Sequence, residues 1–262
     1  MNPDLKTFDV ILVNSSAGKD SQAMLDFVVE QAKAAGVLDR VRVVHADLGR
    51  VEWKGTRELA ERQAAHYSLP FEVVRRDKGD LLEQVELRGK WPDRGNRYCT
   101  SDQKRDQILK SITRLVAERF DGSRPVRVLN CMGLRAGESA ARAKLAPLEM
   151  NKRASNGKRE VFTWLPIHAW TVEQVWARIK ASGVEHHPAY DLGMPRLSCV
   201  FCVFSSRPAL ILAGQKNPEL LAEYVRVEKK IGHTFRHEQP IAEIAEAIAA
   251  GEQPGPITTW EG

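Results

Sequence analysis

The most restrictive feature of the sequence is a strand, a loop of small residues and a helix that follow one another between residues 10 and 33. The apolar, β-branched run from Val10 to Val13 predicts a buried strand. Small residues then interrupt the run, and helical periodicity continues from Gln22 to Lys33. The first turn of a helix has backbone N–H groups without internal partners, and its dipole favours negative charge. The segment therefore predicts a site for a phosphate or another anion.

The side chains of this loop suit a phosphate ligand. Small residues let an anion approach the backbone, Lys19 adds a positive charge, and hydroxyl groups add donors; the residues concerned are Ser15, Ser16, Ala17, Gly18, Lys19 and Ser21. We expect Asp20 either to bind Mg²⁺ or, as the preferred reading, to cap the helix. The spacing G-x-x-x-x-G-K-[ST] is absent, so the loop is not of the Walker type. An ordinary turn between a strand and a helix remains the alternative.

Strands and helices alternate along the first two thirds of the chain. This alternation predicts an α/β fold with a parallel twisted sheet, right-handed crossovers and helices on both faces. The expected strands cover 9–14, 41–46, 71–75 and 126–132, and the expected helices cover 19–35, 56–67, 80–87, 106–120 (capped by Thr100 or Ser101) and 171–182. A β-hairpin is expected over 148–164, because Asn156-Gly157 is a strong turn signal.

We expect two parts in the chain. Residues 1–165 form the nucleotide-binding core, and residues 166–262 form a smaller, mostly helical part that carries two cysteines and packs on the core. The chain has 262 residues, 43% hydrophobic and 28% charged, as a globular protein does. No apolar run approaches the roughly 20 residues that span a bilayer. The first residues show no secretory signal, so we expect a cytoplasmic protein without membrane contact.

Further polar residues follow the ends of other predicted strands. Ligands of open α/β sheets collect at the carboxyl ends of the strands. Asp47 follows the second strand, and Gly133, Arg135 and Glu138 follow the fourth. Arg135 suits a phosphate, and Glu138 either holds Mg²⁺ or orients Arg135. The alternatives are a turn cap for Asp47 and an ordinary acid of the first helical turn for Glu138.

Two basic segments are candidates for contact with a polyanion, which the net charge of +5 and the pI of about 9.0 allow. The loop from Arg88 to Thr100 interleaves basic residues with Trp91 and Tyr98, a pattern that suits phosphate contact and base stacking. The alternative is a solvated loop whose aromatic residues anchor it to the core. The hairpin is basic through Lys152, Arg153, Lys158 and Arg159, and it is either a nucleic-acid arm or a plain solvated hairpin.

Cysteines form the second chemical constellation. Cys199-x-x-Cys202 places two thiolates on one turn, a spacing that suits a metal ion or a cluster. Cys99 is a candidate third ligand, and Cys131 is either the fourth ligand or a buried thiol. His186 and His187 are further candidates. A thioredoxin-type pair is the rival, but such a pair opens a helix after an early strand.

Several of these motifs resemble a known family. Ser16-Ala17-Gly18-Lys19-Asp20-Ser21 resembles the S-G-G-x-D-S pyrophosphate loop of the ATP pyrophosphatases, with Ala17 in place of the first glycine. The segment Gly133–Ser139 is similar to the G-x-R-x-x-E-S segment of the phosphoadenosine-phosphosulfate (PAPS) reductase branch. The resemblance implies an adenine nucleotide alpha hydrolase-like fold that binds ATP and Mg²⁺. It also implies catalytic roles for Lys19, Asp20, Arg135 and Glu138.

Within that family the chain looks most similar to the DNA phosphorothioation proteins, which are DndC-like or SspD-like. This resemblance implies a 4Fe–4S cluster, with zinc as the alternative, on Cys99, Cys131, Cys199 and Cys202. It implies that ATP is cleaved to AMP and pyrophosphate to activate DNA for sulfur insertion, with a cysteine desulfurase and other modification proteins as partners. The reductases have a Cys-Cys pair where this chain has Tyr98-Cys99, and they use a catalytic cysteine in a C-terminal tail. No cysteine follows Cys202 in this sequence.

Two classes of rival function remain open. The first is an enzyme for other substrates, either a sulfonucleotide reductase or a tRNA thiolase. The second is a non-catalytic nucleotide-binding subunit whose Cys199-x-x-Cys202 turn holds a structural zinc. The sequence leaves the oligomeric state open.

Overall fold

The structure is a computed structural model that describes residues 2–257. Its backbone forms two compact units. The sheet unit contains the chain up to Ala46, Gly55–Val74 and Gln107–His187. The helical unit contains Asp47–Lys54, Arg75–Asp106 and the chain from Pro188 onward. The two units differ from the expected division at residue 165. Segments 47–54 and 75–106 belong to the helical unit, and segment 166–187 belongs to the sheet unit.

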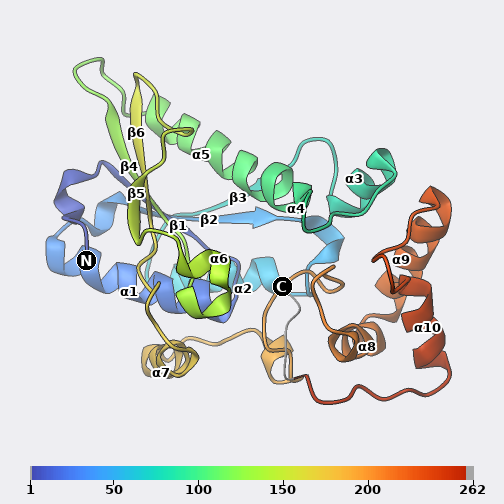
Figure 1. The fold of residues 1–262 in the computed structure, drawn as a ribbon. Helices are drawn as coiled ribbons and strands as arrows, with labels where there is room; N and C mark the ends of the chain where they lie inside the picture. The colour runs from blue at the N-terminus through green and yellow to red at the C-terminus, as the bar shows by residue number, and fades with distance from the viewer. Residues whose placement is uncertain (1, 258–262) are drawn as a thin grey trace. The chain divides into compact units, whose positions relative to one another are not determined.

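The sheet unit is built on a six-stranded sheet with the order β3-β2-β1-β4-β6-β5 (Figure 1). β1 pairs in parallel with β2 and β4, β4 pairs in parallel with β6, and β5 pairs antiparallel with β6. This confirms the expected α/β class and the hairpin. The strands are β1 (Val10–Asn14), β2 (Val41–Asp47), β3 (Phe71–Arg75), β4 (Val126–Cys131), β5 (Leu148–Met150) and β6 (Arg159–Trp164).

Both faces of the sheet are buried, which explains the continuous apolar run of β1. Ile11 and Val13 pack with α1 (Lys19–Ala35), α2 (Thr56–His66) and α7 (Val172–Ser182). Val10 and Leu12 point to the opposite face and pack with α5 (Asp106–Ala117). Figure 1 shows α1 and α5 on opposite faces of the sheet. Because successive strand side chains alternate between faces, four consecutive apolar residues supply both layers.

Local signals fix several helix ends as expected. Gly36 ends α1 with φ 71, a left-handed conformation that glycine adopts without a Cβ penalty. Thr171 and Gln174 form a capping box at the start of α7. Short elements complete the unit: 3₁₀ turns at Leu5–Thr7, Leu38–Arg40 and Ala136–Glu138, and α6 (Ala140–Ala143).

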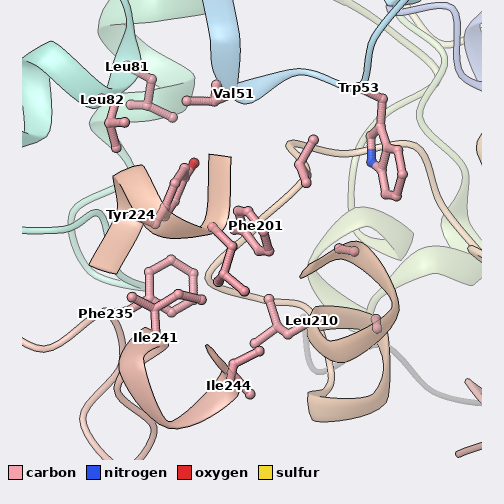
Figure 2. Packing of buried hydrophobic residues seen from close by; sticks show 14 of the residues in the cluster. Val51, Trp53, Leu81, Leu82, Phe201, Leu210, Tyr224, Phe235, Ile241 and Ile244 are labelled. Atoms are coloured by element: carbon pink, nitrogen blue, oxygen red, sulfur yellow. The ribbon is translucent and has the colours of Figure 1, made fainter. Parts of the chain in front are cut away.

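The helical unit buries an aromatic centre of its own. Tyr224 stacks on Trp91 with 5.2 Å between ring centroids, and Phe201 and Phe235 pack edge-on around them. Figure 2 shows Phe201, Tyr224 and Phe235 beside Ile241 and Ile244. The elements are 3₁₀ turns at Gly49–Val51 and Pro188–Tyr190, α3 (Leu81–Arg88), α4 (Tyr98–Thr100), α8 (Arg207–Lys216), α9 (Pro218–Ile231) and α10 (Ile241–Ala249).

The helix cap expected at Thr100 or Ser101 is wrong. Helical backbone begins at Tyr98, with Arg97 as the N-cap residue, and continues through a π-helical turn over Ser101–Arg105 into α5. Thr100 and Ser101 therefore lie inside a helical segment, where their backbone N–H groups already donate to the carbonyl of Arg97. Across residues 2–257, no helix is long and apolar enough to span a bilayer.

Candidate functional site

Hydrogen bonds of the Ser21 hydroxyl group fix the conformation of the loop between β1 and α1. Ser21 Oγ donates to the carbonyl of Gly18 at 2.9 Å, and the backbone N–H of Ser16 donates to Ser21 Oγ at 3.1 Å. Gly18 is the N-cap residue of α1, and no side-chain hydrogen bond caps the helix. The start of α1 is therefore available to an anion, as expected for a phosphate loop.

Ala17 adopts the conformation that the glycine-rich form of this loop favours. Its φ is 55, in the left-handed region, and its methyl group is fully buried. A non-glycine residue in this region carries a strain of roughly 1–2 kcal/mol. The loop thus keeps its tight turn although an alanine replaces the glycine, and the burial of the methyl group offsets part of the strain.

Lys19, Asp20 and Arg135 form a buried charge cluster beside this loop. Asp20 pairs through Oδ1 with Arg135 Nε at 2.5 Å and through Oδ2 with Lys19 Nζ at 3.3 Å. The side chains of Lys19 and Arg135 are each only 5% exposed. The expectation that Asp20 caps α1 is wrong, because its carboxylate binds these cations and Gly18 is the cap residue. Two cations held together by one carboxylate are a suitable receptor for a polyanion.

Glu138 is committed to the turn that carries Arg135. Its Oε2 accepts from the backbone N–H of Arg135 at 2.9 Å, and its carboxylate pairs with Arg142. The carbonyl of Arg142 in turn contacts His168 Nε2 at 2.9 Å. Of the two roles expected for Glu138, this geometry favours orienting Arg135 over holding Mg²⁺.

Gly133 allows the end of β4 to approach the start of α1. A Cβ at Gly133 would lie 3.0 Å from the backbone C and O of Asp20 and from the N of Ser21. Such contacts are tighter than nearly all real Cβ contacts, so a side chain here would require the backbone at Asp20 and Ser21 to shift by a few tenths of an ångström. The residue is thus needed for close packing beside the phosphate loop.

Asp47 lies at the end of β2, as expected. Its Oδ1 accepts from the backbone N–H of Gly49 at 2.7 Å, which is the geometry of an Asx turn. This contact favours the turn-cap alternative, and a role in nucleotide binding stays a prediction.

Sequence reasoning missed a pair of asparagines at the carboxyl ends of two neighbouring strands. Asn14 Nδ2 donates to Asn130 Oδ1 at 2.7 Å and to the carbonyl of Cys131 at 2.8 Å. These bonds tie the end of β1 to the end of β4, directly before the loops that lead to Lys19 and to Arg135. The available signal was an asparagine near the carboxyl end of each of two predicted strands.

Sequence reasoning did not predict the hydrogen bonds that hold the loop at residues 184–187 in place. Gln22 Nε2 donates to the carbonyls of Val184 and Glu185 at 3.0 Å, and Gln63 Nε2 donates to Glu185 at 3.3 Å. His187 is 2% exposed, and its Nε2 lies 3.2 Å from Thr56 Oγ1. His187 is therefore a hydrogen-bonded buried histidine, the alternative to a metal ligand.

The cysteines divide between the two units. Cys99, Cys199 and Cys202 belong to the helical unit and are partly exposed, and Cys99 and Cys199 pack against its apolar core. Burial raises the pKa of the Cys199 thiol, Lys104 lowers it, and the nearby Cys202 and Cys99 raise it further. Among the described residues, however, no three His, Cys, Asp or Glu side chains are arranged to hold a metal ion. As arranged, the three thiols do not fit a cluster or a zinc ion.

Cys131 is a core residue of the sheet unit. Its side chain is fully buried in the apolar cluster with Ile11, Val13 and Leu129, and burial raises the pKa of its thiol. Its Sγ contacts the carbonyl of Leu129 at 3.9 Å. These surroundings favour the alternative of a buried thiol over a fourth metal ligand.

The aromatic residues of the basic loop do not stack on bases. Trp91 is 3% and Tyr98 is 2% exposed, and each donates to a backbone carbonyl, that of His233 and that of Lys90 respectively. The stacking interpretation is wrong, because the aromatic core of the helical unit takes both rings. The arginines of the loop remain at the surface, and Arg88 lies 4.5 Å above the Tyr98 ring.

The hairpin between β5 and β6 presents exposed cations. Lys152, Arg153 and Lys158 are exposed at its turn. Arg159 is buried, and it donates to the carbonyl of Ala154 and to Thr113 Oγ1, both at 2.6 Å. Arg159 therefore fixes the hairpin, whereas the other three cations are available to a partner.

Two curated proteins are similar in sequence to parts of this chain. An uncharacterized 37.8 kDa protein of Escherichia phage 186 is 26% identical over 176 residues, which cover 67% of this chain and 50% of that protein. The adenosine 5'-phosphosulfate reductase of Allochromatium vinosum is 34% identical over 160 residues, which cover 51% of this chain and 59% of the reductase. The chain thus spans between half and three fifths of the length of these relatives.

A solved structure supports the fold alone. The FMN adenylyltransferase of Candida glabrata has a TM-score of 0.50 and 14% identity, over 73% of this chain and 53% of that protein. The family model for the phosphoadenosine phosphosulfate reductase domain matches residues 10–204, which include the phosphate loop, Arg135 and all four cysteines. The chain therefore belongs to the phosphoadenosine phosphosulfate reductase domain family.

Proposed function

We propose that the chain is an ATP pyrophosphatase that adenylates a nucleic-acid backbone so that sulfur can replace an oxygen there. The observation that carries this proposal is the buried cluster of Lys19, Asp20 and Arg135 beside the uncapped start of α1. Cations fixed at a helix N-terminus stabilise the negative charge that develops when a phosphate anhydride bond breaks. The same cations and helix N-terminus suit ATP and also other adenine nucleotides in which a phosphate carries a further phosphate or sulfate group.

In this reaction the phosphates of ATP lie along Ser15–Ser21. An oxygen of the acceptor attacks the α-phosphorus, the bond to the bridging oxygen breaks, and pyrophosphate leaves. Lys19 and Arg135 stabilise the departing charge, while Asp20 keeps both cations in place before the nucleotide binds. The terminal sulfur of a persulfide on a donor protein, by the family resemblance a cysteine desulfurase, then attacks the activated phosphorus, and AMP leaves. A thiol reductant cleaves the remaining S–S bond, so that the sulfur stays on the phosphorus at the sulfide level.

Magnesium would neutralise charge on the phosphates in such a reaction. The carboxylates beside the loop do not form a protein site for it, because Asp20 binds Lys19 and Arg135 and Glu138 binds Arg142 and a backbone N–H. The ion would therefore arrive on the nucleotide and keep most of its ligands from phosphates and water.

The exposed cations of the β5–β6 hairpin support a nucleic-acid acceptor. Lys152, Arg153 and Lys158 stand on one turn that Arg159 fixes from within. Replacing all three with glutamine is expected to weaken DNA binding and to lower the slope of log affinity against log salt by up to about 3, at about one per lost phosphate contact. An unchanged salt slope would remove the hairpin from the proposal.

A sulfonucleotide reductase is the second candidate, which the relative from Allochromatium vinosum favours. The decisive assay measures AMP and pyrophosphate formed from ATP under anaerobic conditions, with and without DNA, next to reduction of adenosine 5'-phosphosulfate. Formation of pyrophosphate that rises with DNA supports the proposal, and reduction of the sulfonucleotide without pyrophosphate formation contradicts it. Lys19→Ala is the control that must abolish pyrophosphate release.

Metal analysis of the same preparation tests the third candidate function, a non-catalytic nucleotide-binding subunit. A colourless protein with stoichiometric zinc that binds ATP without cleaving it would support a nucleotide-binding subunit with a structural zinc. Iron and sulfide with absorbance near 400 nm would instead support the cluster that the family resemblance implies on Cys99, Cys131, Cys199 and Cys202, against the arrangement of the thiols in this structure.

A further inference from the structure

A second polar cavity lies at the opposite edge of the sheet from the phosphate loop. Its volume is about 450 Å³, within the size range of small-molecule sites. Its walls come from residues that precede or begin β1, β2 and β4, and from the segment that follows α5. The phosphate loop follows the carboxyl end of β1, so the two sites lie at opposite ends of the same strands.

Three arginines that line this cavity, Arg40, Arg42 and Arg119, make their hydrogen bonds through one nitrogen of the guanidinium group, Nη1. Arg40 donates through Nη1 to the carbonyls of Lys6 and Phe8, and Arg42 donates through Nη1 to those of Asp39 and Val41. Arg119 uses its Nη1 on the carbonyl of Leu115 and on Glu118.

In all three arginines the Nε and Nη2 atoms have no hydrogen-bond partner among the described residues. That edge is the one that binds an oxyanion through two parallel hydrogen bonds.

The backbone carbonyls that bind Arg40 and Arg42 leave the positive charge of these side chains in place. A carbonyl fixes the guanidinium group without neutralising it, whereas a carboxylate would do both. Arg40 and Arg42 have no carboxylate within ion-pair distance in the described part of the chain, and both are half-buried. Arg124, which also lines the cavity, is different, because Asp9 binds its guanidinium group at 2.6 Å and holds it in place.

Two carboxylates complete the wall, those of Asp39 and Asp121. Asp121 Oδ1 accepts from the backbone N–H and the hydroxyl of Ser123, at 2.9 and 2.7 Å, and these bonds keep the pKa of Asp121 below its ordinary value. Ionised carboxylates accept hydrogen bonds and repel a bare anion. The cavity therefore suits a ligand that combines an oxyanion with hydroxyl donors.

We propose that this cavity binds a phosphorylated sugar, with the phosphate on Arg40, Arg42 and Arg119 and the sugar hydroxyls on Asp39 and Asp121. Carboxylates bind the ribose hydroxyls of nucleotides in this manner in other α/β folds. The ligand is either a free sugar phosphate or a nucleotide, since both present the same chemistry to the cavity.

The test uses ribose 5-phosphate as the probe and isothermal titration calorimetry of the full chain. All proteins carry Lys19→Ala, which weakens binding at the phosphate loop. Because the probe has no anhydride bond and its binding at the phosphate loop is weakened, the result is independent of the proposed ATP cleavage. Adenosine 5'-monophosphate is titrated in parallel to distinguish a nucleotide from a free sugar phosphate.

Arg42→Gln is expected to weaken binding of ribose 5-phosphate at least tenfold. Arg57→Gln is the matched control, because Arg57 is an exposed arginine of the same unit outside the cavity, and it should leave the affinity unchanged. Thermal unfolding of both variants confirms that they are folded. Absence of binding, or equal affinity of the two variants, would overturn the proposal.

Asp39→Asn separates a sugar-phosphate site from a plain anion site. The exchange removes a negative charge, so inorganic phosphate should bind more tightly. Ribose 5-phosphate should gain less from the same exchange, or bind less tightly, because the amide is a weaker hydroxyl acceptor than the carboxylate. An equal gain for both probes would show that the cavity does not recognise the sugar.

Discussion

The carboxylate of Asp20 offers the sharpest test of the candidate site, because it joins two buried cations. Arg135 has a side chain that is 5% exposed, and its contacts are Asp20 Oδ1 at 2.5 Å and the carbonyl of Trp170 at 3.4 Å. Asp20→Ala would leave this guanidinium group buried with one weak acceptor. Removing one partner of a buried ion pair costs about 3 kcal/mol or more of the free energy of unfolding.

A loss of about 3 kcal/mol corresponds to a fall of about 6–12 °C in Tm for a chain of this size. Circular dichroism during heating measures it. Asp20→Asn should cost less, about 1–2 kcal/mol, because the amide oxygen still accepts a hydrogen bond from Arg135 while the charge is lost. A fall of less than about 2 °C for Asp20→Ala, by the same conversion, would refute the claim that Asp20 holds a buried cation in place.

Pyrophosphate should reverse part of this loss. A polyanion that binds only the folded state stabilises it by about 2.7 kcal/mol at a concentration one hundred times its Kd. Without the competing carboxylate, Lys19 and Arg135 should bind pyrophosphate more tightly, so Asp20→Ala should gain more in Tm from pyrophosphate than the unmodified protein gains.

Asp26 provides the matched control. It lies on the same helix, its side chain is 17% exposed against 16% for Asp20, and it pairs with Arg178 and accepts from Tyr67 at 2.7 Å. Asp26→Ala should also lower Tm, but pyrophosphate should stabilise it no more than it stabilises the unmodified protein. An equal gain in both variants would mean that pyrophosphate binds elsewhere.

Three further outcomes are expected. Gly133→Ala should weaken ATP binding about tenfold, or about 1.4 kcal/mol, because its Cβ would lie 3.0 Å from the backbone of Asp20; equilibrium dialysis measures this. Trp91→Ala should destabilise the fold by about 3–5 kcal/mol without changing the salt slope of DNA binding, since the ring is buried. Arg124→Gln should lower stability above pH 4, and this loss should shrink as the pH falls below 3.8. The hydrogen bond from Arg124 lowers the pKa of Asp9 from 3.8, so its stabilisation is complete above that value and is lost as the pH falls. Urea unfolding at each pH measures it.

Much of the fold follows from local patterns. The bounds of α1 and β3 agree with the expectation residue for residue, because Gly36 and the small loop residues mark the ends of α1, and a short β-branched run marks β3. The α7 capping box and the β5–β6 hairpin have equally local causes in Thr171 and Asn156-Gly157. Each of these signals acts within a few residues, so neighbouring side chains suffice to read it.

Local sequence patterns predicted the residues of the candidate site but only some of their roles. The family patterns single out Lys19, Asp20 and Arg135, but the role of Asp20 depends on Arg135, 115 residues away. The sequence therefore suggested a helix cap where the structure has an ion pair. The asparagine pair of Asn14 and Asn130 escaped notice for the same reason, since strand neighbours become visible only when the order of the sheet is known.

Burial decided the remaining differences. Trp91 and Tyr98 sit among arginines in the sequence, which is typical of a nucleic-acid surface, yet both rings are needed to fill the aromatic core around Tyr224. Cys131 shares its residue type with the metal candidates, but it ends a strand whose side chains face the apolar cluster of the sheet unit.

The sequence by itself determined the α/β class, the strand, loop and helix of residues 10–35, and most helix ends, because hydrophobic period, small residues and capping residues act over short distances along the chain. Only the tertiary structure decided which charges pair, which aromatic rings are buried, and which unit each cysteine joins. These depend on residues far apart in sequence, whose contacts arise when the sheet orders its strands and each unit closes around its own core.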